Sequence, residues 1–332
     1  MNSDGREKQR VLITGATGFV GRSLCTFLTE CGYVVRGTYR HQLPINFPVH
    51  IEWKLVPDID SNTEWKEALE DVDCVVHLAA LAHQMGVQGK GRFDEFMRIN
   101  AAGTERLAQE ICESKTVKRL IFISTIGVVK SISDKQLNAE TVCMPENDYG
   151  KSKYAAELAI QEKLKDCEVD WCILRPTLVY GPGNPGNMER LLKLINMGIP
   201  LPLGAVKNRR SFIYIGNFVD AIEKCLSHPN ASRKIFLVSD NEIVSTPELI
   251  RILTRYADKS VKLITVPSPV LRQIGLCGDV VSRFVGRSIG IDTYSISRLT
   301  GSLYVDSTPI KQTLGWAPPF SLEEGLKNTL RA

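Results

Sequence analysis

The 332-residue sequence lacks features that define several whole classes of protein. It has no run of about 18 apolar residues, so we expect no membrane-spanning helix. It has no dense basic block with interleaved aromatic residues, and its net charge of +4 is mild, so nucleic acid is not an expected partner. The first nine residues are polar, which does not fit the apolar centre of a signal peptide.

The nine cysteines are an odd number and show no CxxC spacing. Several lie within predicted strands and helices, among them Cys74, Cys172 and Cys225. This pattern favours reduced thiols in a cytoplasmic protein. We therefore expect neither a disulfide nor a metal site.

A strand, a glycine turn and a helix are predicted near the N-terminus. Val11 to Thr14 is a short apolar, β-branched run, and glycines follow at positions 15, 18 and 21 before a helical pattern that stops at Gly32. Such glycines allow a tight turn, a close approach of backbone to a pyrophosphate and close helix packing, and the helix N-terminus faces the phosphates. The pattern predicts a dinucleotide site formed by Gly15, Thr17, Gly18, Phe19, Val20 and Gly21.

The end of the second predicted strand has no acidic residue. From Tyr33 to Ile51 there is no Asp or Glu, whereas Arg36 and Arg40 are present. An acidic side chain near this point holds the ribose hydroxyls in NAD sites, and a guanidinium suits a 2′-phosphate. The sequence thus favours NADP(H) over NAD(H), with both arginines as phosphate ligands. The alternative is that these arginines are solvated loop charges.

Apolar strands alternate with helical patterns as far as Tyr180. The predicted strands are 11–14, 33–38, 50–56, 73–80, 119–124 and 169–174. This alternation predicts an α/β fold with a Rossmann-type doubly wound parallel sheet. We expect a dinucleotide-binding domain over residues 1–180, with segments near 211–240 returning to it, and a smaller, mixed α/β substrate lobe over residues 181–332.

One apolar stretch of the second half, residues 267–289, carries interspersed arginines. We expect it to form a helical pair of the smaller lobe. Apolar stripes of this kind usually face the core, so a role at a membrane surface is the less favoured interpretation.

The catalytic signal is Tyr149-Gly-Lys-Ser-Lys153. Positions i and i+4 of a helix share a face, so the phenol and the ammonium point to the same spot. The lysine charge, together with a positive nicotinamide, favours the phenolate. Thr125, just after the strand 119–124, can donate to a substrate oxygen. The pattern predicts Thr125, Tyr149 and Lys153 as catalytic residues for interconverting a hydroxyl and a carbonyl.

Two further features belong to the predicted cleft. The strand at 73–80 runs into small residues, which suits a nicotinamide ribose lying against backbone. Asn100 lies among apolar residues of a predicted helix at 93–113, where we expect it to bond a backbone carbonyl near the active site or to cap a kink. His77 is interpreted as a core histidine rather than a catalyst.

Taken together, these motifs resemble the extended short-chain dehydrogenase/reductase family, in its nucleotide-sugar epimerase and 4-ketoreductase branch. The similar segments are TGATGFVG (14–21), HLAA (77–80), NAAGT (100–104), the Tyr149/Lys153 pair, LRPTLVYGPG (174–183) and LGWAPP (314–319). The resemblance implies further cofactor contacts by Asp58, Ile59, Leu78, Ala79, Ala80 and Pro176, in addition to Tyr149 and Lys153. It implies a UDP-sugar substrate held by Ser124, Thr125, Asn187, Arg210 and Arg298, with the two arginines on the diphosphate. It also implies a homodimer.

The residues after Thr125 narrow the reaction. Family members that are nucleotide-sugar 4,6-dehydratases carry Asp-Glu there, whereas this chain has Ile126-Gly127, which cannot supply an acid and a base. With dehydration disfavoured, the reaction that remains is oxidation or reduction at C4 of the hexose, without loss of water. A non-catalytic sensor or scaffold is disfavoured because Tyr149 and Lys153 are both present.

Two C4 reactions fit the resemblance. The segment GIPLPLGAVKNRRSFIYIGN (198–217) resembles enzymes that reduce UDP-2-acetamido-2,6-dideoxy-4-hexulose to UDP-N-acetylquinovosamine for surface polysaccharides such as O-antigen. An NADP(H) preference agrees with a net reductase, so the 4-ketoreductase is the preferred expectation. The alternative is a 4-epimerase of the UDP-glucose or UDP-GlcNAc type. The sequence leaves open the sugar's stereochemistry, the nucleotide and whether the carrier is a lipid.

Overall fold

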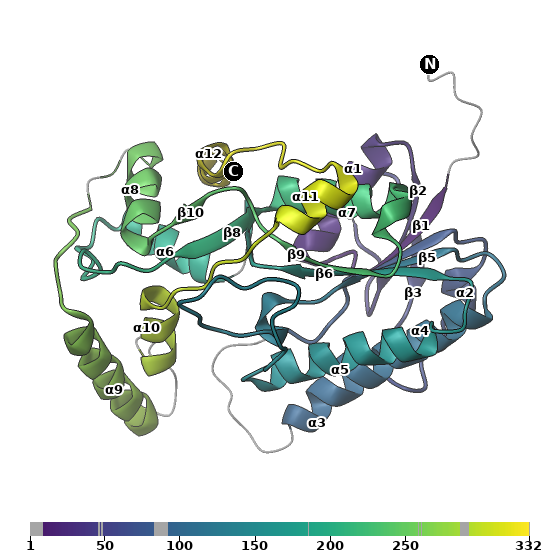
Figure 1. Ribbon diagram of the computed structural model, residues 1–332, viewed down its shortest axis with the longest axis horizontal. Helices are drawn as coiled ribbons and strands as arrows, with labels where there is room; N and C mark the ends of the chain where they lie inside the picture. Colours follow the sequence, from purple (N-terminus) through teal and green to yellow (C-terminus); the bar gives the residue numbers. More distant parts are fainter. Residues whose placement is uncertain are drawn as a thin grey trace.

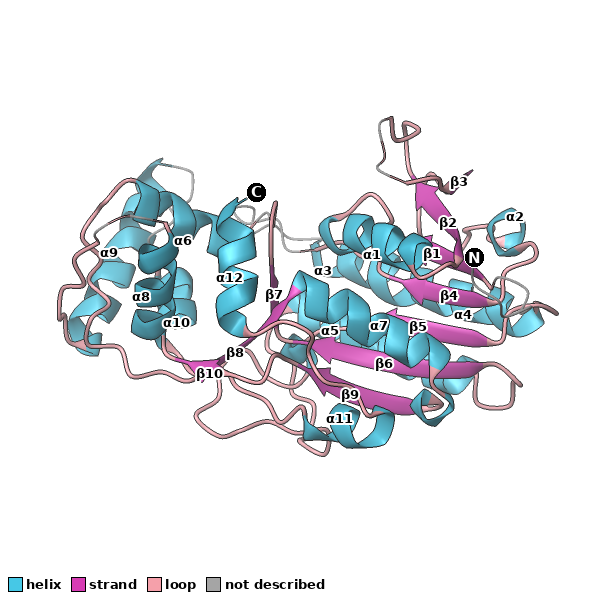
Figure 2. Cartoon of the chain, turned by 90° about the horizontal axis from the view of Figure 1, so that it is seen from above, coloured by secondary structure: helices cyan, strands magenta, loops and turns pink. Residues whose placement is uncertain are grey.

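The computed structural model describes residues 9–331, with gaps at 46, 48, 83–91, 185, 258, 260 and 286–291. Its centre is a parallel sheet of seven strands in the order β3-β2-β1-β4-β5-β6-β9 (Figure 2). The strands are β1 (Arg10–Thr14), β2 (Val34–Tyr39), β3 (Glu52–Leu55), β4 (Cys74–His77), β5 (Arg119–Ile123), β6 (Asp170–Pro176) and β9 (Lys234–Val238). The strand order reverses between β1 and β4, so the predicted Rossmann-type sheet is confirmed.

Helices cover both faces of this sheet (Figure 1). Because side chains alternate along a strand, Val11 and Ile13 face one layer and Leu12 faces the other. The first layer contains α1 (Phe19–Glu30) and α7 (Ile215–Ser227), and the second contains α4 (Gly103–Glu113) and α5 (Asp148–Lys163). The sheet is therefore buried on both faces, as expected for all-parallel strands.

A second, smaller sheet has the order β10-β8-β7. Its strands are β7 (Leu178–Tyr180), β8 (Arg210–Tyr214) and β10 (Ile243–Val244), with β10 antiparallel to β8. Around it lie α6 (Asn187–Asn196), α8 (Thr246–Tyr256), α10 (Thr293–Thr300) and α12 (Leu322–Arg331) (Figures 1 and 2). The chain crosses between the two sheets more than once. Strand β8 belongs to the small sheet, the following helix α7 packs on the large sheet, and β9 is a strand of the large sheet.

The stretch at 267–289 that was expected to form a core-facing helical pair is described only as far as residue 285. Residues 268–285 form one helix, α9 (Ser268–Val285), which packs on α10 through Asp279 and Thr293. Val270, Ile274 and other apolar side chains of α9 are exposed. The expectation of a core-facing stripe holds for Leu271, which is buried in the main core cluster, and is wrong for these exposed side chains. No helix within the described residues is long and apolar enough to cross a membrane.

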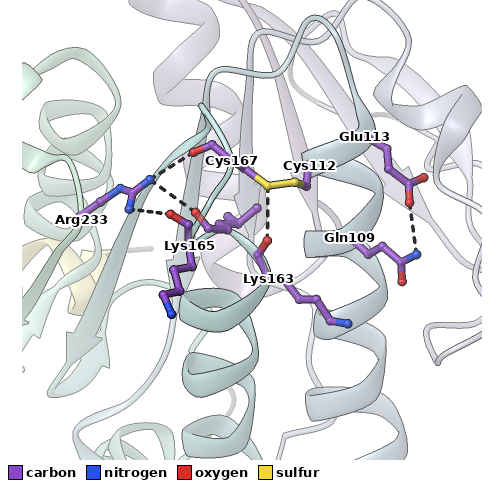
Figure 3. The surroundings of a disulfide bond; sticks show 8 residues. Gln109, Cys112, Glu113, Lys163, Lys165, Cys167 and Arg233 are labelled. Carbon is purple, nitrogen blue, oxygen red and sulfur yellow. Dashed lines mark hydrogen bonds between the residues drawn. A yellow bond between two sulfur atoms is a disulfide. The ribbon is translucent and has the colours of Figure 1, made fainter.

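The expectation that the chain forms no disulfide is also corrected. Cys112, near the end of α4, is bonded to Cys167, in the turn after α5 (Figure 3). Their Cα atoms are 5.8 Å apart, within the usual range for a disulfide. The other seven cysteines are free. The 55-residue separation explains why a search for short cysteine spacings missed this pair.

Candidate active site

The glycine turn joins β1 to α1 and lies against the end of β4. Gly15 has a φ of +69°, and a Cβ added there would lie 2.9 Å from the Ala79 nitrogen. A Cβ on Gly21 would lie 2.2 Å from the Gly15 carbonyl oxygen, so the turn accepts only glycine at these two positions. No side chain caps α1, whose N-cap is Gly18, and Thr17 and Gly18 are exposed. The turn has the shape and the open N–H groups that fit a dinucleotide pyrophosphate.

A buried chain of hydrogen bonds runs outward from β1. Ala79 N–H donates to Thr14 Oγ1 over 3.1 Å, and Thr14 Oγ1 lies 2.7 Å from His77 Nδ1. On the other side, His77 Nε2 lies 3.0 Å from Thr104 Oγ1, which donates to the Asn100 carbonyl over 2.6 Å. Since Thr104 uses its only hydrogen on Asn100, His77 must donate from Nε2 and accept at Nδ1. Burial lowers the pKa of His77 to about 3, so the ring is neutral.

Asn100 lies in a π-helical segment, Met97–Ala102, between α3 (Arg92–Phe96) and α4. Its side-chain oxygen accepts from Leu81 N–H over 2.7 Å, and its Nδ2 donates to the Leu81 carbonyl over 3.1 Å and to Ser152 Oγ over 3.0 Å. The expected bond from Asn100 to a backbone carbonyl is confirmed. The alternative role of Asn100, capping a kink, stays a prediction, and the π-helical segment is of a kind that often occurs at functional sites.

Tyr149 and Lys153 lie one turn apart at the start of α5, whose first turn is capped by the Asn147 side chain. Lys153 is buried, with its ammonium 4.0 Å from the centre of the Phe122 ring. Burial raises the pKa of Tyr149 to about 12 and lowers the pKa of Lys153 to about 7. In the chain alone, burial therefore outweighs the expected help from the lysine charge, and the phenol is protonated at neutral pH.

Ser124 and Thr125 follow β5 at its carboxyl end. Ser124 is buried, and its Oγ has no hydrogen-bond partner among the described residues. Thr125 Oγ1 accepts from Gly127 N–H over 3.1 Å, which leaves its own hydrogen available to a ligand. A Cβ on Gly150 would lie 2.7 Å from the Gly127 carbonyl oxygen, so this loop touches the first turn of α5. The fold thus brings Ser124 and Thr125 close to Tyr149.

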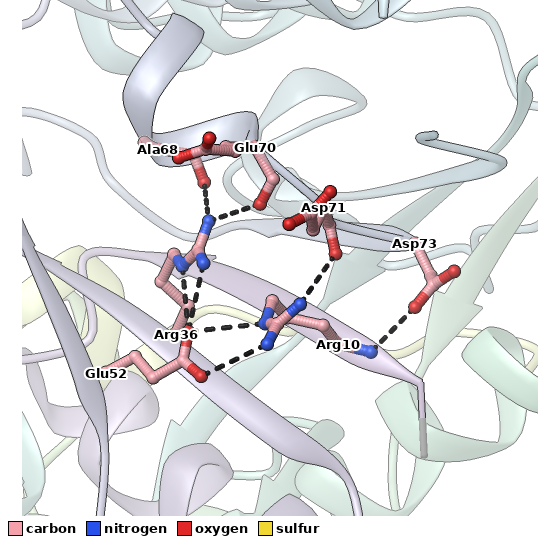
Figure 4. Close-up of polar contacts among 7 residues, drawn as sticks. All are labelled: Arg10, Arg36, Glu52, Ala68, Glu70, Asp71 and Asp73. Atoms are coloured by element: carbon pink, nitrogen blue, oxygen red, sulfur yellow. Dashed lines mark hydrogen bonds and ion pairs between the residues drawn. The ribbon is translucent and has the colours of Figure 1, made fainter. Parts of the chain in front are cut away.

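The assignment of Arg36 to a cofactor phosphate is corrected by the structure (Figure 4). Its guanidinium donates to Glu52 over 3.1 and 3.0 Å from Nε and Nη2, and Nη1 donates to the carbonyls of Ala68 and Glu70. Arg36 is buried by these contacts and is not available to a phosphate. The reason is that β3 places Glu52 directly beside it in register. Arg40 is exposed just beyond the end of β2.

Asp58 and Ile59 lie in the loop after β3. Ile59 is buried, and Asp58 accepts from the Ile59 N–H and from Arg98, contacts that lower the pKa of the Asp58 carboxyl. Of the other expected cofactor residues, Leu78, Ala79 and Ala80 are half-buried directly after β4, and Pro176 ends β6. These positions fit the resemblance, and their contacts with a cofactor stay a prediction.

A small, partly open pocket lies between the small sheet and the helices around it. Arg210 and Arg298 line it, together with Leu178, Met188, Leu191, Phe212, Thr246, Leu249 and Leu299. Arg210 is buried and donates to the carbonyls of Arg298 and Gly301, with no carboxylate partner among the described residues. Burial, helped by the Arg298 charge, lowers the pKa of Arg210 to about 10. The two arginines suit a diphosphate.

One expected substrate residue falls partly outside the described structure. Asn187 begins α6, next to the pocket residue Met188, but its side chain lies outside the described part of the chain. Sequence reasoning also missed a buried ion pair that joins Glu157 of α5 to Arg175 of β6. Glu157 receives two hydrogen bonds from Arg175, of 3.0 and 2.6 Å. The i+4 spacing of Glu157 from Lys153 predicts only that Glu157 shares the helix face of Lys153, and no local spacing identifies Arg175 as its partner.

Comparison with known proteins agrees with this geometry. The NAD dependent epimerase/dehydratase family matches residues 11–239. A UDP-glucose 4-epimerase of Vibrio cholerae is 38% identical over 99% of this chain and 97% of its own length. An N-acetyl-alpha-D-glucosaminyl-diphospho-ditrans,octacis-undecaprenol 4-epimerase of Escherichia coli O157:H7 is 28% identical over 97% of this chain and 94% of its own length. The structure of UDP-glucuronic acid 4-epimerase from Bacillus cereus with NAD has a TM-score of 0.75 at 21% identity, covering 97% and 98% of the two chains.

Proposed function

The chain belongs to the NAD dependent epimerase/dehydratase family and is an enzyme of the short-chain dehydrogenase/reductase type, and we propose that it is an NAD-dependent 4-epimerase of a UDP-hexose. The observation that carries this proposal is the grouping of Tyr149 and Lys153 with the unpartnered hydroxyl of Ser124 and the neighbouring Thr125. The names of the relatives from V. cholerae and E. coli support a C4 reaction.

Each group of the site has a defined task under this proposal. A bound nicotinamide ring supplies the acceptor and donor of a hydride. Tyr149 accepts the proton of the C4 hydroxyl and later returns it, while Thr125 donates to the C4 oxygen. Because burial keeps the phenol protonated in the chain alone, we expect deprotonation of Tyr149 to need the positive charge of the oxidised cofactor. Arg210 and Arg298 hold the diphosphate, so the hexose is free to turn within the site.

The same assignment divides the chain into two regions. We propose that residues 1–180, with segments near 211–240, bind the dinucleotide, and that residues 181–332 bind the sugar nucleotide. The glycine turn at the end of β1 supports the first part. The pocket with Arg210 supports the second, although Arg210 itself comes from β8, where the two regions meet.

One of the two arguments for a 4-ketoreductase, the expected preference for NADP(H), is weakened by the structure. It drew on a basic end of β2 that would select NADP(H), and Arg36 is occupied by Glu52 and two backbone carbonyls. Of the two arginines expected to bind a 2′-phosphate at the end of β2, only Arg40 is exposed there. The family, by its description, is NAD dependent. We therefore place the epimerase first and NAD as its cofactor.

One set of assays tests the proposal. The purified protein is denatured, the released dinucleotide is identified, and the protein is assayed with UDP-glucose, UDP-GlcNAc and their C4 epimers. We expect bound NAD and interconversion of one pair without net oxidation. Tyr149→Phe should abolish turnover while leaving cofactor binding intact. NADPH oxidation that depends on a 4-keto sugar, with no epimerisation, would instead establish the reductase.

A second candidate substrate is an N-acetylhexosamine diphosphate carried on a polyprenol. The name of the E. coli relative describes such a substrate. The exposed apolar side chains of α9 favour it for this chain, since a lipid-linked sugar is reached at a bilayer. An assay with polyprenyl-diphosphate GlcNAc beside UDP-GlcNAc separates the two candidates.

A further inference from the structure

The buried ion pair of Glu157 and Arg175 lies one helical turn beyond Lys153 and has no task in the reaction proposed above. Glu157 follows Lys153 by four residues on α5, so the two side chains share one face of the helix. The exposed fractions of Lys153, Glu157 and Arg175 are 1%, 0% and 4%. Three charged side chains are therefore buried together at the catalytic helix.

Arg175, on β6, fixes the position of the Glu157 carboxylate. Its Nε donates to Oε1 over 3.0 Å and its Nη2 donates to Oε2 over 2.6 Å, so both carboxylate oxygens are held. A buried ion pair contributes little net stability, because the cost of removing two charges from water offsets their attraction. Its main electrostatic effect falls on the buried charge that shares the helix face of Glu157, which is Lys153.

The other groups around Lys153 in the described part of the chain supply no carboxylate. From β5, the Phe122 ring lies with its centre 4.0 Å from the ammonium. From β4 comes His77, whose ring is neutral because burial lowers its pKa to about 3. On α5 itself, Tyr149 is protonated in the chain alone, because burial raises its pKa to about 12.

Glu157 therefore opposes the effect of burial on Lys153. Burial lowers the pKa of Lys153 to about 7, and the Glu157 carboxylate acts in the opposite direction. The Cys143 thiol, beside Arg175, is neutral because burial raises its pKa, so it does not replace Glu157 as the partner anion. Without the charge on Glu157, the balance at Lys153 shifts toward the neutral amine.

We propose that Glu157, fixed by Arg175, is a positioning residue that keeps the Lys153 ammonium protonated and so supports proton transfer at Tyr149. The part that concerns Tyr149 rests on the proposed function, whereas the effect on Lys153 does not. The carboxylate of Glu157 is committed to Arg175. Glu157 therefore acts on the reaction through Lys153 alone.

Direct titration of Lys153 tests the proposal without turnover. The full chain is isotope-labelled at lysine Cε, Lys153→Met identifies the resonance, and NMR follows it as the pH is changed. Glu157→Gln removes the charge with little change of shape and should lower the pKa of Lys153 by about one unit or more. Arg175→Met should raise it, because the carboxylate then acts without a competing cation. Glu162→Gln removes the same charge from an exposed position on α5 and, as the matched control, should leave it unchanged.

The pH dependence of kcat gives a second readout, which depends on the proposed function. In Glu157→Gln, Lys153 loses its proton at lower pH, so the alkaline limb of the kcat profile should move to lower pH by a similar shift. The KM for the UDP-sugar should not change, because Glu157 does not touch the substrate under this proposal. Glu162→Gln should reproduce the native profile, and circular dichroism checks that each variant is folded.

Two results would overturn the role of Glu157. One is an unchanged pKa of Lys153 in Glu157→Gln. The other is a lower pKa of Lys153 in both Glu157→Gln and Arg175→Met, because loss of packing at the ion pair would then explain both changes. If the pKa shifts appear as expected in a protein without epimerase activity, the role of Glu157 stands and the proposed function fails.

Discussion

The Nδ2 group of Asn100 donates a hydrogen bond to the Ser152 hydroxyl across 3.0 Å, and this bond joins the π-helical segment to the helix that carries Tyr149 and Lys153. Ser152 in turn donates to the Tyr149 carbonyl over 2.9 Å. The Asn100 carbonyl also accepts a hydrogen bond from Thr104, which is linked through His77 to Thr14 beside the glycine turn. The cofactor turn and the catalytic helix are therefore held by one connected set of buried hydrogen bonds.

Replacing Asn100 should loosen both parts of the site. Asn100→Ala leaves the Leu81 N–H and carbonyl without their side-chain partner, and we expect a loss of about 1–3 kcal/mol of unfolding free energy. We also expect a lower kcat, because Tyr149 loses support through Ser152. Urea unfolding and steady-state rates measure the two effects. Ser152→Ala, which keeps both bonds between Asn100 and Leu81, should cost less, and equal stability of Asn100→Ala and the native chain would contradict this account.

Arg36 should matter for stability and not for cofactor choice. Arg36→Ala removes the partner of Glu52 and leaves the Ala68 and Glu70 carbonyls unpaired, and we expect it to destabilise the fold by about 2–4 kcal/mol. The ratio of the dissociation constants for NADH and NADPH should not change. Thermal unfolding and cofactor titration provide the measurements. Arg40→Ala is the control at the exposed end of β2, and a selective loss of NADPH binding in Arg36→Ala would restore the phosphate-binding assignment.

Lys153 should make stability depend on pH above neutrality. Burial lowers its pKa to about 7, whereas the unfolded chain retains the ordinary value of 10.5. Between these pH values the unfolded state binds more protons than the folded state, so stability rises with pH by up to about 1.4 kcal/mol per pH unit. Lys153→Met should remove this contribution. Urea unfolding of both proteins from pH 7 to 9 measures the difference, and parallel profiles would show that Lys153 is charged when folded.

The bond between Cys112 and Cys167 should stabilise the oxidised chain. Closing a loop with a 55-residue separation contributes about 2–4 kcal/mol to unfolding free energy. We expect reducing agent to lower the stability of the native chain by this amount and to leave Cys112→Ser unaffected. Urea unfolding with and without reductant measures the effect, and peptide mapping without reduction identifies the bond. Cys277→Ser, at an exposed free cysteine, is the control. Free thiols at both positions in air-oxidised protein would overturn the assignment.

Local sequence was sufficient where a structure depends on neighbours along the chain. The turn after β1 needs glycine at Gly15 and Gly21, and Tyr149 and Lys153 share a face of α5 because they are four residues apart. The alternation of strands and helices likewise determined the parallel sheet. The expected role of Asn100 followed from a polar residue placed among apolar ones.

Tertiary structure decided what depends on segments far apart in the sequence. Arg36 could face a cofactor or a carboxylate, and the register of β3 beside β2 placed Glu52 against it. Cys112 and Cys167 meet only because α4 and α5 pack side by side, and α9 buries Leu271 in the main core cluster while Ile274 stays exposed. Composition and periodicity determine which residues can be buried, but the partner that each side chain meets is set by the packing of the whole chain.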